Sequence, residues 1–239
     1  WQSIIKFFIM FPLYTVASME KEQRIKELPF WNSLTAQQKD ILRRSALTRK
    51  YPKGSYIYSG DKDCLGLLYL TSGEIRTYLL SDEGREVTLF RLYPTEVCVL
   101  ATSCVISQIS FETHMTAQKD TEVLIIPAGM VSILKEQNIY VRCFLYELAT
   151  QRFSDVMWSM QQILFQGLDR RLANFLIAEQ ARVGSDTIRM THEQIALHIS
   201  SAREAVARIL KQFSEEGLVE LKRGAIILCD REALAKLDK

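Results

Sequence analysis

The stretch from Val131 to Gln166 contains neither glycine nor proline, and its apolar residues recur with a helical period. Five of them alternate in spacings of four and three residues, as in the seam of a coiled coil; they are Ala149, Phe153, Val156, Met160 and Ile163. A second apolar row widens this face and consists of Leu145, Leu148 and Leu164. The pattern predicts a long helix over residues 136–166, ended by Gly167. A seam of this kind favours pairing with a second copy of the chain over burial within a monomer.

Between Tyr51 and Pro127 the pattern changes to short runs of β-forming residues. Turn residues such as Pro52-Lys53-Gly54 and Ser72-Gly73 separate these runs. The runs span residues 55–58, 65–70, 74–80, 86–92, 96–101, 110–117 and 123–126. Many short strands at close intervals predict an antiparallel barrel or sandwich.

The N-terminal 50 residues divide into an apolar start and a helical region. Residues 1–18 are apolar but shorter than the roughly 20 residues of a spanning helix, and they loosely resemble the apolar region of a signal peptide. Met19 begins a segment that resembles a natural start, so we interpret residues 1–20 as a leader or an extra N-terminal element. Residues 20–50 predict short helices, one opened by a capping box of Thr35 and Gln38.

The segment from Thr191 to Phe213 predicts two short helices joined by a tight turn. Thr191 and Gln194 form a capping-box pattern at the first helix, and Ser201 with Glu204 predicts a cap for the second. The second helix has an apolar face of Val206, Ile209, Leu210 and Phe213. Its opposite face carries Arg203, Glu204, Ala207, Arg208 and Lys211. This is the helix-turn-helix pattern of DNA-binding proteins.

A predicted hairpin over residues 218–228 follows, with Lys222 and Arg223 at its tip. An arginine at position 203 or 208 can donate two hydrogen bonds to guanine, and a glutamate at position 204 can accept one from cytosine. The cations expected to anchor phosphates are Lys211, Lys222 and Arg223. Because the formal net charge is only +2, the prediction of DNA binding depends on this local placement.

From about residue 25, the chain resembles the cyclic-AMP receptor protein / fumarate-nitrate reductase regulator (Crp/Fnr) superfamily. HEQIALHISSAREAVARIL is similar to the helix-turn-helix of that family, and Arg203, Glu204 and Arg208 match its reading motif. Ser200 departs from the pattern, because the family usually has glycine there. A left-handed backbone would cost a non-glycine residue about 1 kcal/mol. Residues 70–75 and 82–86 resemble hairpins of the family's sensor domain.

The resemblance implies an α+β fold with three parts. These are an N-terminal antiparallel β-barrel of the cyclic-nucleotide-binding jelly-roll type over residues 21–135, a dimerisation helix over residues 136–166 and a winged helix-turn-helix over residues 167–239. It implies a cytoplasmic homodimer without a membrane segment that binds double-stranded DNA at an inverted repeat related to TGTGA, with Ser201 also near the DNA. Further partners implied are RNA polymerase and an effector.

The resemblance is weakest in the effector region. Glu96 matches the family, but no arginine lies between Arg91 and Arg142 to hold a cyclic phosphate, which argues against cyclic AMP. Three interpretations of the neighbouring Cys98, Cys104 and His114 stay open. They are core residues, or redox-sensing thiols or ligands of haem or a metal, or they line a pocket for a small organic effector. No cysteine precedes Cys64, which argues against an iron–sulfur cluster in an N-terminal arm.

Other function classes find less support in the sequence. Its five cysteines form no C-x-x-C pair, which argues against a secreted disulfide framework and a structural zinc site and for a reducing cytoplasm. A cupin-type enzyme gathers several histidines on one metal, but only His114 lies in the expected barrel. His192-Glu193 lacks the second histidine of a metalloprotease motif, so we expect no enzyme. The remaining alternative is a sensor or regulatory subunit that acts by protein contacts instead of DNA.

Overall fold

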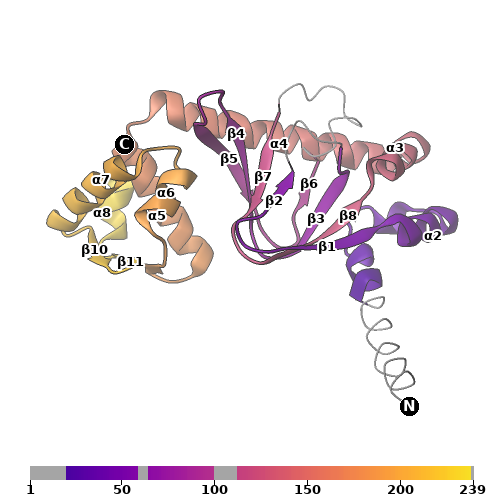
Figure 1. Ribbon diagram of the computed structural model, residues 1–239, viewed down its shortest axis with the longest axis horizontal. Coiled ribbons are helices and arrows are strands. Elements are labelled where there is room, and N and C mark those ends of the chain that lie inside the picture. The colour runs from indigo at the N-terminus through magenta and orange to yellow at the C-terminus, as the bar shows by residue number, and fades with distance from the viewer. Residues whose placement is uncertain (1–19, 59–63, 100–111, 238–239) are drawn as a thin grey trace, which may run out of the picture. The chain divides into compact units, whose positions relative to one another are not determined.

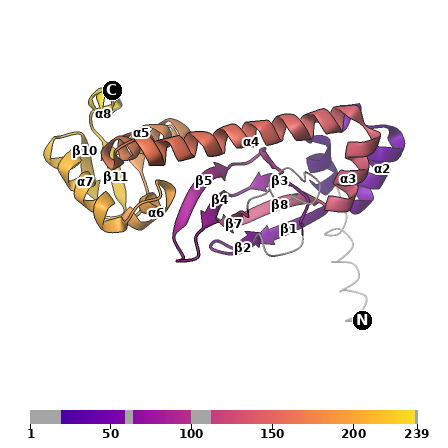
Figure 2. The same ribbon diagram turned by 90° about the horizontal axis from the view of Figure 1, so that it is seen from above.

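The computed structural model describes residues 20–58, 64–99 and 112–237, and Figures 1 and 2 label the elements. The chain forms two compact units, one of residues 1–77 and 91–154 and the other of residues 78–90 and 155–239. The domain boundaries expected at residues 20, 135 and 166 stay predictions. In the part of the chain that the structure describes, no helix is both long and apolar enough to span a membrane.

In the first unit, helices come before and after the strands. These helices are η1 (Trp31–Ser33), α2 (Ala36–Ser45), α3 (Ala128–Gln137) and the first part of α4 (Ile139–Phe165). The capping box expected at Thr35 is confirmed, because its side chain accepts from Gln38 N and its N–H donates to Gln38 Oε1. Asn138, between α3 and α4, donates from Nδ2 to Ser33 O at 2.9 Å and to Gln38 Oε1 at 3.1 Å. This amide therefore ties the junction of α3 and α4 to α2.

The strands before α3 form two four-stranded sheets. One has the order β1 (Leu47–Tyr51), β8 (Thr121–Ile126), β3 (Leu67–Ser72) and β6 (Val97–Cys98). The other has the order β2 (Tyr56–Tyr58), β7 (His114–Ala117), β4 (Ile75–Leu80) and β5 (Glu86–Leu92). Over the described residues the sheets do not close into a barrel, so the expected closed barrel is corrected to a two-sheet arrangement of the jelly-roll kind.

Strand β1 differs from the sequence prediction, which expected helices up to residue 50. Its residues are mostly exposed, with no alternation of buried and exposed side chains. The strand pairs antiparallel with β8, with Leu47 opposite Ile125 and Tyr51 opposite Thr121. Backbone pairing at a sheet edge, not an apolar pattern, therefore decides the structure here.

The core of the first unit joins one sheet to the helices. Tyr69, Leu124 and Leu145 belong to one buried cluster that also contains Trp31 from η1. The rings of Phe30 and Phe144 lie 5.3 Å apart between centroids. Leu148 and Ala149 of α4 pack against this cluster, so one apolar row of α4 covers the core of its own unit.

The second unit is built around a small helical core. Its elements are α5 (Leu168–Val183), β9 (Thr187–Ile188), α6 (His192–His198), α7 (Arg203–Glu215), β10 (Val219–Lys222), β11 (Ala225–Leu228) and α8 (Arg231–Lys236). The strand order is β10-β11-β9. Gly184 ends α5 in the left-handed region with φ 67°, which glycine adopts without steric cost. The unit also includes residues 78–90, the hairpin between β4 and β5.

Candidate nucleic-acid interface

Helices α6 and α7 are joined by the tight turn that the sequence predicts. Thr191 opens α6 with a complete capping box, since its Oγ1 accepts from Gln194 N at 3.2 Å and its N–H donates to Gln194 Oε1 at 2.8 Å. The predicted cap of α7 is wrong. Ala202 is the N-cap residue and has no side chain able to cap, while Ser201 lies one residue earlier and donates its N–H to Ala196 O at 2.9 Å. Ser201 is therefore part of the turn.

Helix α7 has the two faces expected from its sequence. Its buried residues are Val206, Ile209, Leu210 and Phe213. The side chains predicted to meet DNA lie on the exposed part of the helix; they are Arg203, Glu204, Arg208 and Lys211. Lys211 Nζ lies 3.7 Å from Glu215 Oε1 in an exposed ion pair, which holds it only weakly.

The hairpin after α7 carries the predicted basic tip. Strands β10 and β11 pair antiparallel up to Lys222 and Ala225, which leaves Arg223 and Gly224 as a two-residue loop. Gly224 has φ 73°, a left-handed conformation that glycine adopts without steric cost. Lys222 and Arg223 are exposed, and Lys222 Nζ lies 3.5 Å from Glu220 Oε1.

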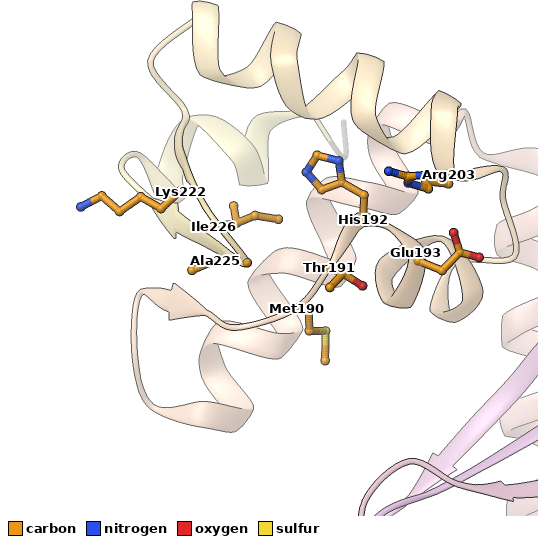
Figure 3. A pocket seen from close by; sticks show the side chains of 9 residues that line it. Met190, Thr191, His192, Glu193, Arg203, Lys222, Ala225 and Ile226 are labelled. Carbon is orange, nitrogen blue, oxygen red and sulfur yellow. The ribbon is translucent and has the colours of Figure 1, made fainter. Parts of the chain in front are cut away.

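The start of α6, the start of α7 and this hairpin surround one pocket (Figure 3). Its lining residues are Met190, Thr191, His192, Glu193, Arg203, Lys222, Gly224, Ala225 and Ile226. Arg203 and His192 lie on one side and Lys222 on the other. Sequence reasoning did not include His192 in the site, although its position directly after the cap Thr191 places it at the start of α6. The ammonium of Lys222 points away from His192 and Arg203 in this view, so these nitrogen donors could hold phosphates of a nucleic-acid backbone at separate points.

The residues predicted for the effector pocket lie in the first unit. Glu96 Oε2 accepts from Tyr93 N at 2.8 Å and thus closes its own turn. Cys98 is fully buried on β6, opposite Leu68 of β3, and is not part of a disulfide. His114 is half-buried at the start of β7, and Cys104 lies outside the described residues. Within the described ranges, no group of three or more His, Cys, Asp and Glu side chains could hold a metal ion.

The cysteines of the described residues differ in their bonding. Cys64 is disulfide-bonded, whereas Cys143 and Cys229 are exposed free thiols. The spacing of the cysteines gave no signal for this bond, because a disulfide depends on proximity in the folded chain.

Comparisons with known proteins agree with this geometry. Residues 170–237 match the model of the Crp-like helix-turn-helix domain, and residues 48–138 match the model of the cyclic nucleotide-binding domain. A solved putative transcriptional regulator of the Crp/Fnr family from Eubacterium rectale ATCC 33656 is 42% identical, with a TM-score of 0.83 over 89% of this chain and 99% of that chain. The chain belongs to the Crp/Fnr family. This Crp/Fnr protein is thus a DNA-binding transcription regulator with a cyclic-nucleotide-binding-like domain.

Curated relatives extend along most of the chain. The cyclic AMP receptor protein of Thermus thermophilus is 26% identical over 84% of this chain and 93% of its own length. The transcriptional activator protein anr of Pseudomonas aeruginosa is 26% identical over 86% of each chain. Crp/Fnr regulators bind DNA and act as dimers. The matched relatives are regulators, not enzymes.

Proposed function

We propose that the protein is a homodimeric transcription regulator that reads an inverted repeat of TGTGA-like half-sites with Arg203, Glu204 and Arg208. The observation that carries this proposal is the exposed N-terminal part of α7, which bears these three side chains beside a basic hairpin tip. A role as a transcription regulator implies RNA polymerase as a further partner.

The side chains divide into base readers and phosphate anchors. Arg203 begins α7 and Arg208 lies five residues further on, so the two arginines project from neighbouring turns of one helix. Each can bind guanine O6 and N7, and Glu204 can accept from cytosine N4. The anchors that set the position on the duplex are Ser201, Lys211, Lys222 and Arg223 together with His192. Salt should therefore weaken binding to every duplex. A base change within a half-site should weaken binding only to the duplex that carries it.

The dimer contact is proposed for the part of the α4 seam that its own chain leaves uncovered. Phe153 is 62% exposed and Met160 37%, whereas Val156 is only 7% exposed. Other large apolar side chains exposed on α4 are Tyr146, Met157, Trp158, Leu164 and Phe165. Phe153, Met157, Met160 and Leu164 recur at spacings of four, three and four residues and so share one face of the helix, and exposed apolar side chains gathered on one face mark an interaction site. From Ala149 to Ile163 the seam would join two copies and place the two α7 helices in successive major grooves, roughly 34 Å apart.

The controlling signal is proposed to enter through the first unit and to differ from cyclic AMP. The matched names include both a cyclic AMP receptor protein and an anaerobic regulatory protein, so they do not select an effector. The disulfide of Cys64 favours a redox signal, and the further groups proposed to take part in it are Cys98, Cys104 and His114. The remaining candidates are haem and a small organic effector bound near Glu96.

Selection of binding sites from a pool of randomised duplexes tests this function. The full chain is incubated with the pool, once reduced and once after mild thiol oxidation, and the bound DNA is sequenced. We expect an enriched inverted repeat with TGTGA-like half-sites, and a dependence of its yield on the redox state. Enrichment of no motif in either state would favour the alternative of a regulatory subunit that acts by protein contacts.

A further inference from the structure

Within the second unit, the β4–β5 hairpin is bonded to the turn between α6 and α7. Thr88 of β5 donates its backbone N–H to Ser200 Oγ at 3.0 Å. Its hydroxyl Oγ1 donates to Leu197 O at 2.6 Å. Both residues are buried, with Thr88 8% and Ser200 6% exposed. Two hydrogen bonds from a single buried residue thus join the hairpin to the helix-turn-helix.

Ser200 occupies the sterically demanding position of this turn. Its φ of 54° lies in the left-handed region, where glycine is the residue without a steric penalty. Glycine would remove that strain, but it has no hydroxyl to accept the Thr88 N–H. This hydrogen bond explains why a serine stands at a strained position: without its Oγ, a buried amide of β5 would lose its hydrogen-bond acceptor.

The same turn is held from other sides as well. Arg171 of α5 donates from Nη1 to Ile199 O at 3.0 Å, and Ser201 N–H donates to Ala196 O. Ser159 of α4 donates its hydroxyl to the carbonyl of Leu89, the residue after Thr88 in the hairpin. Thr88 thus belongs to a short chain of contacts that runs from α4 through β5 to the residues directly before α7.

Charged side chains of both signs lie beside the turn. Arg85 and Glu86 of the hairpin and Arg171 of α5 line one pocket together with Ser200, Ser201 and Ala202. Burial and then the positive charge of Arg85 lower the pKa of Arg171. The like charges of Arg85 and Arg171 repel each other, whereas the two hydrogen bonds of Thr88 join neutral groups.

We propose that Thr88 is a positioning residue that latches the β4–β5 hairpin onto the helix-turn-helix, and that Ser200 stands at the turn to receive it. Since β4 and β5 continue into the first unit, the latch makes the position of α7 sensitive to the state of those strands. By reciprocity, DNA bound to α7 changes the order of the hairpin. This second statement rests on the proposed function, whereas the latch itself does not.

Hydrogen–deuterium exchange of the full chain tests the latch without DNA. Thr88→Val removes the hydroxyl, and Ser200→Ala removes the acceptor. Loss of a buried hydrogen bond should speed exchange of both residues 78–90 and residues 197–203 about tenfold, equivalent to about 1.4 kcal/mol. Thr88→Ser keeps the hydroxyl and should retain the wild-type rates. Thr48→Val, on the exposed edge strand β1, controls for the loss of a threonine hydroxyl elsewhere.

Ser200→Gly separates the latch from a purely conformational role of the turn. The latch predicts that this variant also speeds exchange of the hairpin, although its turn is relaxed. Unchanged or slower hairpin exchange in Ser200→Gly, or unchanged hairpin exchange in Thr88→Val, would overturn the latch.

A second arm adds the duplex selected by the wild-type protein. Here we expect DNA to alter hairpin exchange in the wild type but not in Thr88→Val. If DNA binds without altering the hairpin, the coupling is refuted; if no DNA binds, the proposed function fails, while the first arm still decides the latch.

Discussion

Arg203 of α7 and Lys222 of β10 line the same pocket from two different elements (Figure 3). Arg203 is the first residue of the helix, and Lys222 is the last residue of a strand that ends at the hairpin tip. A duplex that places base edges against α7 would bring its backbone towards the hairpin. The two cations should therefore serve different purposes, and their replacement should have different consequences.

Replacement of Arg203 should reduce sequence discrimination. Arg203→Ala removes a bidentate contact to guanine, which is worth about 1–3 kcal/mol of discrimination against the wrong base. Arg203→Lys keeps the charge but loses the planar fork, so it should discriminate poorly and still bind through electrostatics. The affinities of both variants for the selected duplex and for duplexes with single base changes measure this effect. Wild-type discrimination by Arg203→Ala would show that this residue reads no base.

Replacement of Lys222 should weaken binding evenly across sequences. Lys222→Ala removes one phosphate contact, so the slope of log affinity against log salt should fall by about 1 for each protomer that binds. Titrations at several salt concentrations, on selected and scrambled duplexes, measure the slope. Glu220→Gln is a matched control, because it removes the partner of the Lys222 ion pair and keeps the cation. A loss confined to the selected duplex would contradict the anchoring role.

Replacement of Phe153 should weaken the dimer. This side chain is 62% exposed on α4, and Phe153→Asp would place a charge in the proposed apolar contact. A central aromatic side chain at an interface is worth about 2 kcal/mol or more, so the dissociation constant should rise about 30-fold or more. Sedimentation equilibrium measures it, with Gln161→Asp at an exposed position of α4 as the control. An unchanged constant would exclude this part of the seam from the dimer contact.

The stability of the first unit should fall at alkaline pH because of Tyr69. Its hydroxyl donates to Glu27 Oε2 at 2.9 Å, and burial, followed by the hydrogen bond and charge of Glu27, raises the pKa of Tyr69 to about 12. The unfolded chain releases this proton near pH 10. The stabilisation that the folded state gains from the protonated Tyr69 is therefore fully present below about pH 10 and is lost by about pH 12. Urea unfolding across this range should show a steeper decline for the wild type than for Tyr69→Phe. Parallel declines would contradict the shifted pKa.

Patterns that are local in sequence predicted local structure well. The capping boxes at Thr35 and Thr191 are confirmed, because a cap needs only residues three positions apart. The run predicted over residues 86–92 coincides with β5. The apolar face of α7 is also confirmed, since its 3.6-residue period records which side is buried.

Features that depend on residues far apart in the chain were not predicted from the sequence. Strand β1 forms by pairing with β8, whose residues lie 70 to 78 positions further along the chain, and the side chains of β1 show no alternation of buried and exposed residues. The division into two sheets depends on which strands pair with each other, and the sequence predicts the strands but not their pairing. The cap of α7 falls one residue later than predicted, at Ala202, and Ser201 lies in the turn, where its N–H donates to Ala196 O. The bonds of Thr88 to residues 197 and 200 likewise connect segments that no motif relates.

Fluorescence anisotropy of a labelled duplex tests the central claim most directly. The wild-type protein is titrated onto a duplex with an inverted TGTGA repeat and onto a scrambled duplex, each with reductant and with a mild thiol oxidant. Preferential binding of the repeat in at least one redox state, with the preference lost in Arg203→Ala, is the predicted result. Equal affinity for both duplexes in both redox states would contradict the proposed site and its reading by α7.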